Sequence, residues 1–211
     1  MFTGIVQEVG KILNITKNGD NNVVEIKAGK ILKELKIGES ISVDGICSTL
    51  TDLTKDGFKV SYMPETLKRT TANTWGKNDN VNLEAALSVN DKINGHFVLG
   101  HIDNTGKILK ISKNKESLEM DIEFPMELSK FIAFKGSVTI DGVSLTISYL
   151  DENYFTVSLI PHTIKNTTLG AKKKNDKVNI EVDMISRYLQ RLFDERDKQS
   201  SYEFLHERGF I

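Results

Sequence analysis

The sequence predicts an all-β protein in which two similar domains follow one another and a helix ends the chain. Three observations lead to this fold class. The first half recurs in the second at an offset of 97 residues, each half divides into short strand-like segments, and the unmatched end of the chain has helical spacing. A chain of 211 residues is long enough for two domains of about 95 residues, each with its own core.

The repeat is visible as three blocks that occur in the same order in both halves. The matched blocks are Ser40–Cys47 with Ser137–Ser144, Pro64–Thr71 with Pro161–Thr168, and Asn78–Glu84 with Asn175–Glu181. Over three ungapped windows around these blocks, 19 of 40 positions are identical, where average composition would give roughly two or three. A period this long indicates two similar domains rather than a solenoid.

Turn pairs such as Asp44-Gly45 and Asp141-Gly142 separate the short apolar segments of each half. The strands expected in the first half, with counterparts in the second, are Val23–Ile26, Ser40–Val43, Cys47–Leu53, Phe58–Tyr62 and Val81–Ala85. Helices are expected over Ala28–Leu35, Pro64–Thr71, Met126–Phe134 and Pro161–Thr168. Proline begins two of these helices, as its fixed φ angle favours. Many short strands at close spacing favour a sandwich or a small barrel.

The segment after Asp183 has no partner in the repeat. Its apolar residues recur at the spacing of one helix face: Ile185, Tyr188, Leu189, Leu192 and Phe193. Polar and charged residues fill the other face. Two interpretations stay open, a helix that packs on its own domain and a helix that joins copies of the chain.

Composition excludes several classes of function. Lys and Arg total 28 against 29 Asp and Glu, so the net charge of −1 creates no positive field for nucleic acid or an anionic membrane. No apolar run approaches the ~18 residues of a membrane span. The opening Met1–Val6 lacks the basic region of a secretory signal. The single cysteine cannot form an intramolecular disulfide and indicates a reducing compartment, so we expect a cytoplasmic protein.

Small hydroxyl residues recur at equivalent positions of the two halves. The pairs are Thr49 with Thr146, Ser61 with Ser158, and Thr66 with Thr163. They are consistent with two copies of one pocket that recognises hydroxyl groups. They are equally consistent with strand propensity and helix capping, so both interpretations stay open.

At other equivalent positions the two halves differ, and one half then carries a reactive side chain that the other half lacks. Cys47 corresponds to Ser144, Ile5 to His101, and Glu65 to His162. His101 beside Ser144 would make a proton-transfer pair, because imidazole titrates near neutrality. A buried small thiol and a structural histidine are the simpler alternatives. His96 and His101 are five residues apart, which suits neither one helix face nor one strand face, so we expect no metal site.

Colinear motifs over essentially the whole chain resemble the riboflavin synthases of the α-chain type. The matching segments are Met1–Val6, Gly95–Asp103, Asp141–Thr146, Leu159–Thr163 and Thr167–Gly170. The second of them resembles the family's Gly-His-x-x-x-Gly-His segment, and the third its Asp-Gly-[IV]-Ser-Leu-Thr motif. Two positions depart from the pattern, since Ser48 stands where leucine is usual and His162 where glutamate is usual.

The resemblance implies two six-stranded Greek-key β-barrels and a C-terminal α-helix, assembled as a homotrimer. The barrels would span residues 1–96 and 97–185, and the trimerisation helix and tail residues 186–211. The family's reaction is a dismutation, in which two molecules of 6,7-dimethyl-8-ribityllumazine exchange a four-carbon unit. The products are riboflavin and 5-amino-6-(ribitylamino)uracil. No cofactor or metal is implied; association with lumazine synthase is a further prediction.

The resemblance also implies a site between the N-terminal barrel of one subunit and the C-terminal barrel of its neighbour. His101 and Ser144 would assist removal of a proton from a ring methyl group, and Cys47 would contact the partner lumazine. Substrate-binding roles fall on Gly4, Ile5, Val6, Ser48, Thr49, Ser61, Met63, Thr66, Gly100, Ile102, Lys135, Leu145, Thr146, Ser158, Ile160 and Thr163.

Three other functions compete with this one. A non-catalytic lumazine- or flavin-binding antenna protein would be expected to lose residues such as His101, Ser144 and Thr146, which are present here. A flavin-dependent reductase barrel usually carries an Arg-x-Tyr-[ST] motif, which this sequence lacks. A purely structural β-protein would not explain the hydroxyl pairs together with the unmatched Cys47, Ser144 and His101.

Overall fold

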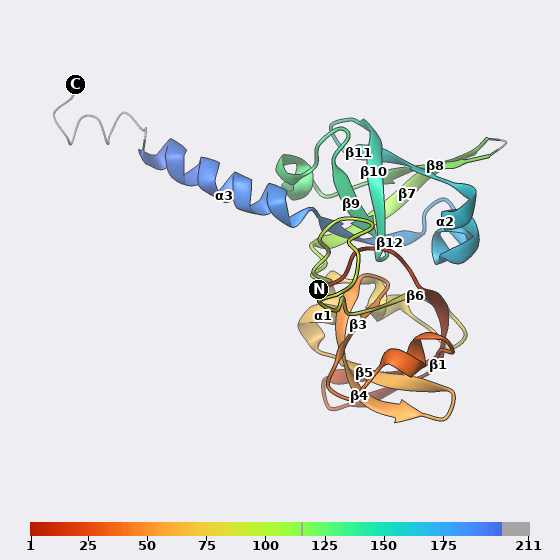
Figure 1. Ribbon diagram of the computed structural model, residues 1–211. Helices are drawn as coiled ribbons and strands as arrows, with labels where there is room; N and C mark the ends of the chain where they lie inside the picture. The colour runs from red at the N-terminus through yellow and green to blue at the C-terminus, as the bar shows by residue number, and fades with distance from the viewer. Residues whose placement is uncertain (115, 200–211) are drawn as a thin grey trace, which may run out of the picture.

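The computed structural model describes residues 1–114 and 116–199, which form two β-barrels and a helix that extends away from them (Figure 1). The first barrel contains β1 (Glu8–Asn18), β2 (Asn21–Lys27), β3 (Ser40–Val43), β4 (Ile46–Thr54), β5 (Gly57–Tyr62) and β6 (Asn80–Ala85). The second contains β7 (Asn104–Lys113), β8 (Leu118–Glu123), β9 (Ser137–Ile140), β10 (Val143–Leu150), β11 (Tyr154–Leu159) and β12 (Lys177–Val182). Both barrels are closed and antiparallel, which confirms the predicted all-β fold.

The two barrels have the same strand order. Around the first barrel the order is β1-β2-β5-β4-β3-β6, and around the second it is β7-β8-β11-β10-β9-β12. The five expected strands of the first half lie within β2 to β6. The sequence did not predict β1, because polar and charged residues occupy most of it and a bulge between Ile12 and Asn14 interrupts its alternation.

Each barrel encloses its own apolar core. Phe58 and Ile26 lie fully buried in the first barrel, and Phe155 and Ile122 in the second. Along β5 and β8, apolar residues that face the core alternate with polar or charged residues that face outward. Each fully buried side chain of this size contributes about 1.5–3 kcal/mol through removal of apolar surface from water.

Short helical turns connect the strands. They are α1 (Pro64–Arg69), α2 (Pro161–Asn166) and the 3₁₀ turns η1 (Ile31–Glu34), η2 (Thr71–Thr74), η3 (Met126–Phe131) and η4 (Thr168–Ala171). Proline begins α1 and α2, as predicted. The helices expected over residues 28–35 and 126–134 are shorter and are 3₁₀ turns, which form readily as brief connectors between strands.

The barrels meet at a pseudo-symmetric seam, which we call the inter-barrel seam. The side-chain amide of Asn82 donates to the carbonyl of Asp141 (2.8 Å), and the amide of Asn179 donates to the carbonyl of Asp44 (2.9 Å). Both aspartates are buried, and the ammonium of Lys172 lies 2.7 Å from the carboxylate of Asp141. These buried, paired polar groups fix how the two halves face each other.

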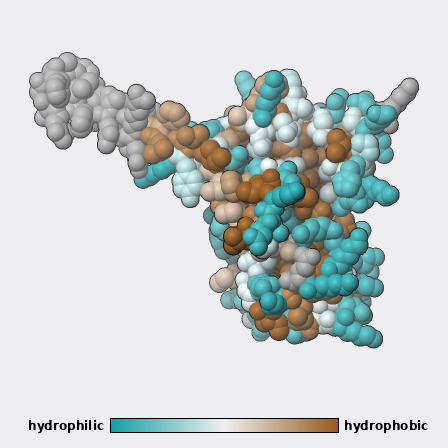
Figure 2. Space-filling view, viewed as in Figure 1, coloured by the Kyte–Doolittle hydropathy of each residue, from teal (hydrophilic) through white to brown (hydrophobic). Residues whose placement is uncertain are grey.

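The C-terminal helix α3 (Met184–Gln199) projects from the second barrel (Figure 1). The five apolar residues predicted to line one face, Ile185, Tyr188, Leu189, Leu192 and Phe193, are all exposed, and hydrophobic surface is visible along the helix in Figure 2. The remainder of the predicted tail, residues 200–211, lies outside the described residues. No helix within the described ranges is long and apolar enough to cross a membrane.

Candidate active site

Two short segments cross from one half of the molecule to the other. Residues 1–7 precede β1, yet the carbonyl of Gly4 accepts a hydrogen bond from the backbone N–H of Ser144 in the second barrel (2.8 Å). Residues 98–103 precede β7, and the carbonyl of Gly100 accepts from the backbone N–H of Cys47 in the first barrel (2.8 Å). Each barrel therefore receives a strip of backbone that belongs, by sequence, to the other barrel.

Glycine is required where these segments touch the barrels. Gly4 and Gly100 have positive φ angles of 76° and 79°. A Cβ atom at Gly4 would lie 2.6 Å from the Cβ of Ser144, and one at Gly100 would lie 2.6 Å from the Cβ of Cys47. The contact thus depends on the absence of a side chain as well as on a left-handed backbone.

A buried glutamate anchors each crossing segment. Glu84 accepts hydrogen bonds from the N–H groups of Thr3 and Gly4, while Glu181 accepts from those of Leu99 and Gly100. Burial raises the pKa of Glu84, and it raises the pKa of Glu181 to about 7, with the hydrogen bonds acting in the opposite direction. These glutamates hold the segments in place by satisfying backbone donors that would otherwise be buried unpaired.

The first site is a cavity of about 210 Å³ on the surface of the first barrel. Cys47 lines it from β4 and Thr66 from α1, and the crossing segment contributes Gly100, His101 and Ile102. The structure therefore brings together five residues that the sequence singled out. An ion pair between Glu65 and Arg69 of α1 borders the same cavity.

The second site lies at the equivalent place on the second barrel, where residues 4–6 take the position of residues 100–102. Ser144 is half-buried there, and its hydroxyl is hydrogen-bonded to Nδ1 of His96 (2.7 Å). Nε2 of the same imidazole is 3.2 Å from the hydroxyl of Thr139. Burial lowers the pKa of His96, although the charge of Asp183 opposes the shift, so the ring is neutral at physiological pH.

His101 and Ser144, predicted to act together, belong to different sites of the chain. His101 lies in the cavity with Cys47, and His96 is the histidine that reaches Ser144. Sequence reasoning noted His96 but gave it no role beyond an improbable metal site. The repeat comparison gave no signal for it, because none of the matched blocks includes His96.

Most predicted substrate-binding side chains face outward around the two sites. Thr49, Ser61, Thr146 and Ser158 are exposed on the outer faces of β4, β5, β10 and β11. Thr163 is half-buried in α2. Met63 and Ile160 directly precede α1 and α2 and are 65% and 62% exposed. Ile5 is exposed, whereas Val6 packs against the core of the second barrel.

Two predicted substrate-binding side chains point into the barrels instead. The hydroxyl of Ser48 lies inside the first barrel, 2.8 Å from the hydroxyl of Tyr62. Leu145, its counterpart, is part of the second barrel's apolar core. Side chains alternate along a strand, so the neighbours of Cys47 and Ser144 face the opposite way. The side chains of Ser48 and Leu145 thus face the barrel cores, and a binding role for these two residues, through their backbone, stays a prediction.

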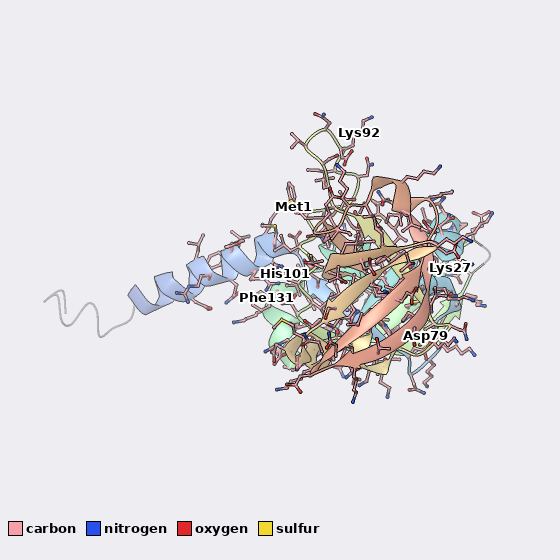
Figure 3. The ribbon with its side chains drawn as sticks, turned by 90° about the horizontal axis from the view of Figure 1, so that it is seen from below. Met1, Lys27, Asp79, Lys92, His101 and Phe131 are labelled. Carbon is pink, nitrogen blue, oxygen red and sulfur yellow. The ribbon has the colours of Figure 1, made fainter. Side chains whose placement is uncertain are left out.

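Lys135 stands in a turn of the second barrel with a positive φ angle of 64°, where the first barrel has Gly38. A left-handed backbone is uncommon for lysine. Its side chain is exposed, and the ammonium lies 5.5 Å from the centre of the Phe134 ring. Figure 3 labels His101, which lines the first cavity. Within the described ranges, no group of three or more His, Cys, Asp or Glu is arranged to hold a metal ion.

The fold and the paired crossing segments define a class of protein: tandem barrels of one strand order that carry two equivalent sites. The lumazine binding domain model matches residues 3–86 and 99–183. Riboflavin synthase from Bacillus subtilis (strain 168) is 44% identical over all of both chains, and riboflavin synthase from Actinobacillus pleuropneumoniae is 43% identical over the same extent. The chain belongs to the lumazine-binding family and, within it, to the riboflavin synthases.

Solved structures support the same assignment. LumP complexed with riboflavin aligns with a TM-score of 0.81 at 26% identity, and the match covers 86% of this chain and 99% of that one. LumP complexed with 6,7-dimethyl-8-(1'-D-ribityl) lumazine aligns with a TM-score of 0.79. The higher identity and full coverage of the synthases favour an enzyme over an antenna protein.

Proposed function

We propose that this riboflavin synthase converts two molecules of 6,7-dimethyl-8-ribityllumazine into riboflavin and 5-amino-6-(ribitylamino)uracil. The two products together contain every atom of the two substrates, so the reaction needs no external oxidant or reductant. The observation that carries the proposal is the pair of equivalent sites, at each of which a crossing segment bonds to the backbone of the other barrel, at Cys47 and at Ser144. Two like pockets suit a reaction between two copies of one molecule, because holding them in register supplies much of the rate enhancement.

The residues of the two pockets divide the chemistry between them. In our proposal Thr49, Thr66, Thr146 and Thr163 bind ribityl hydroxyls or polar ring atoms. Removal of a proton from a ring methyl group needs a base and polar groups to stabilise the anion. We assign this step to His101 and Ser144, with Cys47 in contact with the second lumazine and Lys135 offsetting negative charge.

This assignment requires two copies of the chain, because His101 and Ser144 belong to different sites in one copy. We infer that the catalytic site forms between the N-terminal barrel of one subunit and the C-terminal barrel of another. A homotrimer held together by α3 would bring these two barrels into contact. The exposed apolar face of α3 supports its role in assembly. Cytoplasmic location and association with lumazine synthase remain predictions.

The test is to incubate the purified protein with 6,7-dimethyl-8-ribityllumazine alone and follow riboflavin absorbance. One riboflavin should form for every two lumazines consumed. Tight binding without riboflavin would contradict the proposal and favour an antenna protein.

His101→Ala and Ser144→Ala should each lower kcat about 100-fold while ligand affinity changes little, as expected for groups that act in proton transfer. Unchanged kcat would remove them from the mechanism.

A further inference from the structure

The linker between the barrels passes directly over Ser144 of the second site. It leaves β6 at Ala85, forms a loop that protrudes near Lys92 (Figure 3), and returns at Gly95 and His96. A Cβ atom at Gly95 would lie 2.1 Å from the carbonyl oxygen of Thr3, 2.9 Å from the Cβ of Ser144 and 3.0 Å from its hydroxyl. The backbone at Gly95 therefore fills the gap between Thr3 and Ser144, with no room for a side chain.

Neither wall of this gap is free to move aside. Thr3 is buried, and both its N–H and its hydroxyl donate to the carboxylate of Glu84 (2.7 and 2.9 Å). Ser144 is held through its N–H by the carbonyl of Gly4. A side chain at position 95 would consequently push the linker outward rather than displace the walls.

The next residue shows what depends on this close approach. The N–H of His96 donates to the carbonyl of Thr3 (3.2 Å), which fixes the backbone, and the imidazole reaches the hydroxyl of Ser144. Outward movement of the linker would break both contacts. The first site is arranged differently, because the histidine that lines its cavity with Cys47 is His101 of the crossing segment, whereas His96 of the linker is hydrogen-bonded to Ser144.

We propose that Gly95 is a positioning residue for the second site: its missing side chain lets the linker pass between Thr3 and Ser144 and brings the His96 imidazole to the Ser144 hydroxyl. The consequence for catalysis rests on the proposed function. The two sites then differ in reactivity for two reasons. The linker brings the His96 imidazole to Ser144, and the first site has Cys47 where the second has Ser144.

Gly95→Ala tests the proposal, with Gly76→Ala as the matched control. A Cβ at Gly76 would meet only a carboxylate oxygen of Asp79 at 3.7 Å. Gly95→Ala should lower kcat about 10- to 100-fold with KM changed less than threefold, and its pH–rate profile should match that of His96→Gln. The double variant should be no slower than His96→Gln alone. Normal kcat in Gly95→Ala or in His96→Gln, or losses that multiply in the double variant, would overturn the proposal.

A spectroscopic measurement separates this inference from the proposed function. The ¹⁵N signals of the imidazole report the hydrogen bond of His96 directly, without any turnover. They should shift in Gly95→Ala toward those of an exposed histidine and stay in place in Gly76→Ala. Unshifted signals would overturn the positioning role even in a fully active enzyme. If Gly95→Ala does not fold, Ser144→Ala in the unaltered backbone should shift the Nδ1 signal of His96, and an unshifted signal would contradict the assigned contact.

Discussion

The hydroxyl of Tyr62 lies inside the first barrel, within hydrogen-bond distance of the hydroxyl of Ser48. Burial raises the pKa of Tyr62, so the group stays a neutral phenol that needs a partner. In the second barrel the same two positions hold Leu159 and Leu145, both buried in the apolar core. Ser48, which departs from the family pattern, is therefore explained by packing: the small side chain makes room for the larger Tyr62.

Ser48→Leu should destabilise the protein by about 2–4 kcal/mol. The larger side chain overfills the barrel, and the hydroxyl of Tyr62 loses its partner. Adding Tyr62→Leu recreates the pair found in the second barrel and should recover most of the loss, as urea unfolding of both variants would show. Additive losses in the double variant would contradict the explanation.

Residue types alone indicated Cys47, Thr66 and His101, and the structure places all three in one cavity. The inward direction of the Ser48 side chain could not be predicted, because motif position does not record which way a strand side chain points. His96 was missed because its contact with Ser144 depends on the path of the linker, and the repeat offers no comparison there.

At the scale of elements, helix α3 exposes an apolar face that a lone chain does not cover. Leu189 and Leu192 are 49% and 63% exposed. The sequence predicted the helix but left open what it packs against. Ion pairs of Arg187 with Asp103 and of Asp194 with Lys130 join the helix to the second barrel, yet the apolar face stays exposed.

Leu189→Glu combined with Leu192→Glu should convert the proposed trimer to monomers and reduce activity at least 10-fold. Two charges cannot be buried in an apolar interface without a large desolvation cost. Light scattering coupled to size exclusion measures the mass, and Val89→Glu, at a fully exposed apolar position of the linker, is the control for a glutamate added to the surface. A double variant that keeps both mass and activity would exclude α3 as the assembly element.

At the scale of the whole molecule, the repeat predicted two equal barrels but not how they exchange their leading segments. The only signal of that exchange was a glycine at position 4 and another at position 100. Their function depends on contacts between segments far apart in the sequence. The inter-barrel seam also breaks the symmetry, because Lys172 is replaced by Trp75 at the equivalent position of the first half.

This asymmetry leaves two buried aspartates and one lysine at the seam. Burial raises the pKa of Asp44 well above its usual value, and the charge of Asp141 raises it further. Lys172 and the backbone N–H of Asn82 act in the opposite direction, and Asp79 adds to the increase. Burial favours a lower pKa for Lys172, but the two carboxylates outweigh it and raise the pKa to about 12.

The sign of the resulting pH dependence follows from proton binding. Above the unfolded-state pKa of about 3.9, the unfolded chain has lost the proton that folded Asp44 still holds. The free energy of unfolding therefore falls as the pH rises, by about 1.4 kcal/mol for each pH unit up to the folded-state pKa. Asparagine cannot ionise and keeps the oxygen that accepts from Asn82.

Asp44→Asn should therefore match the unaltered protein in stability near pH 4 and exceed it increasingly as the pH rises toward the folded-state pKa of Asp44. Urea unfolding at each pH measures this difference, and the subtraction removes the shared contributions of Glu84 and Glu181, whose pKa values are also raised. Lys172→Met should instead cost about 3–5 kcal/mol at neutral pH, because it leaves Asp141 buried and uncompensated. Parallel stability curves for Asp44→Asn and the unaltered protein would show that Asp44 is ionised in the fold, and that the seam holds two negative charges against one positive.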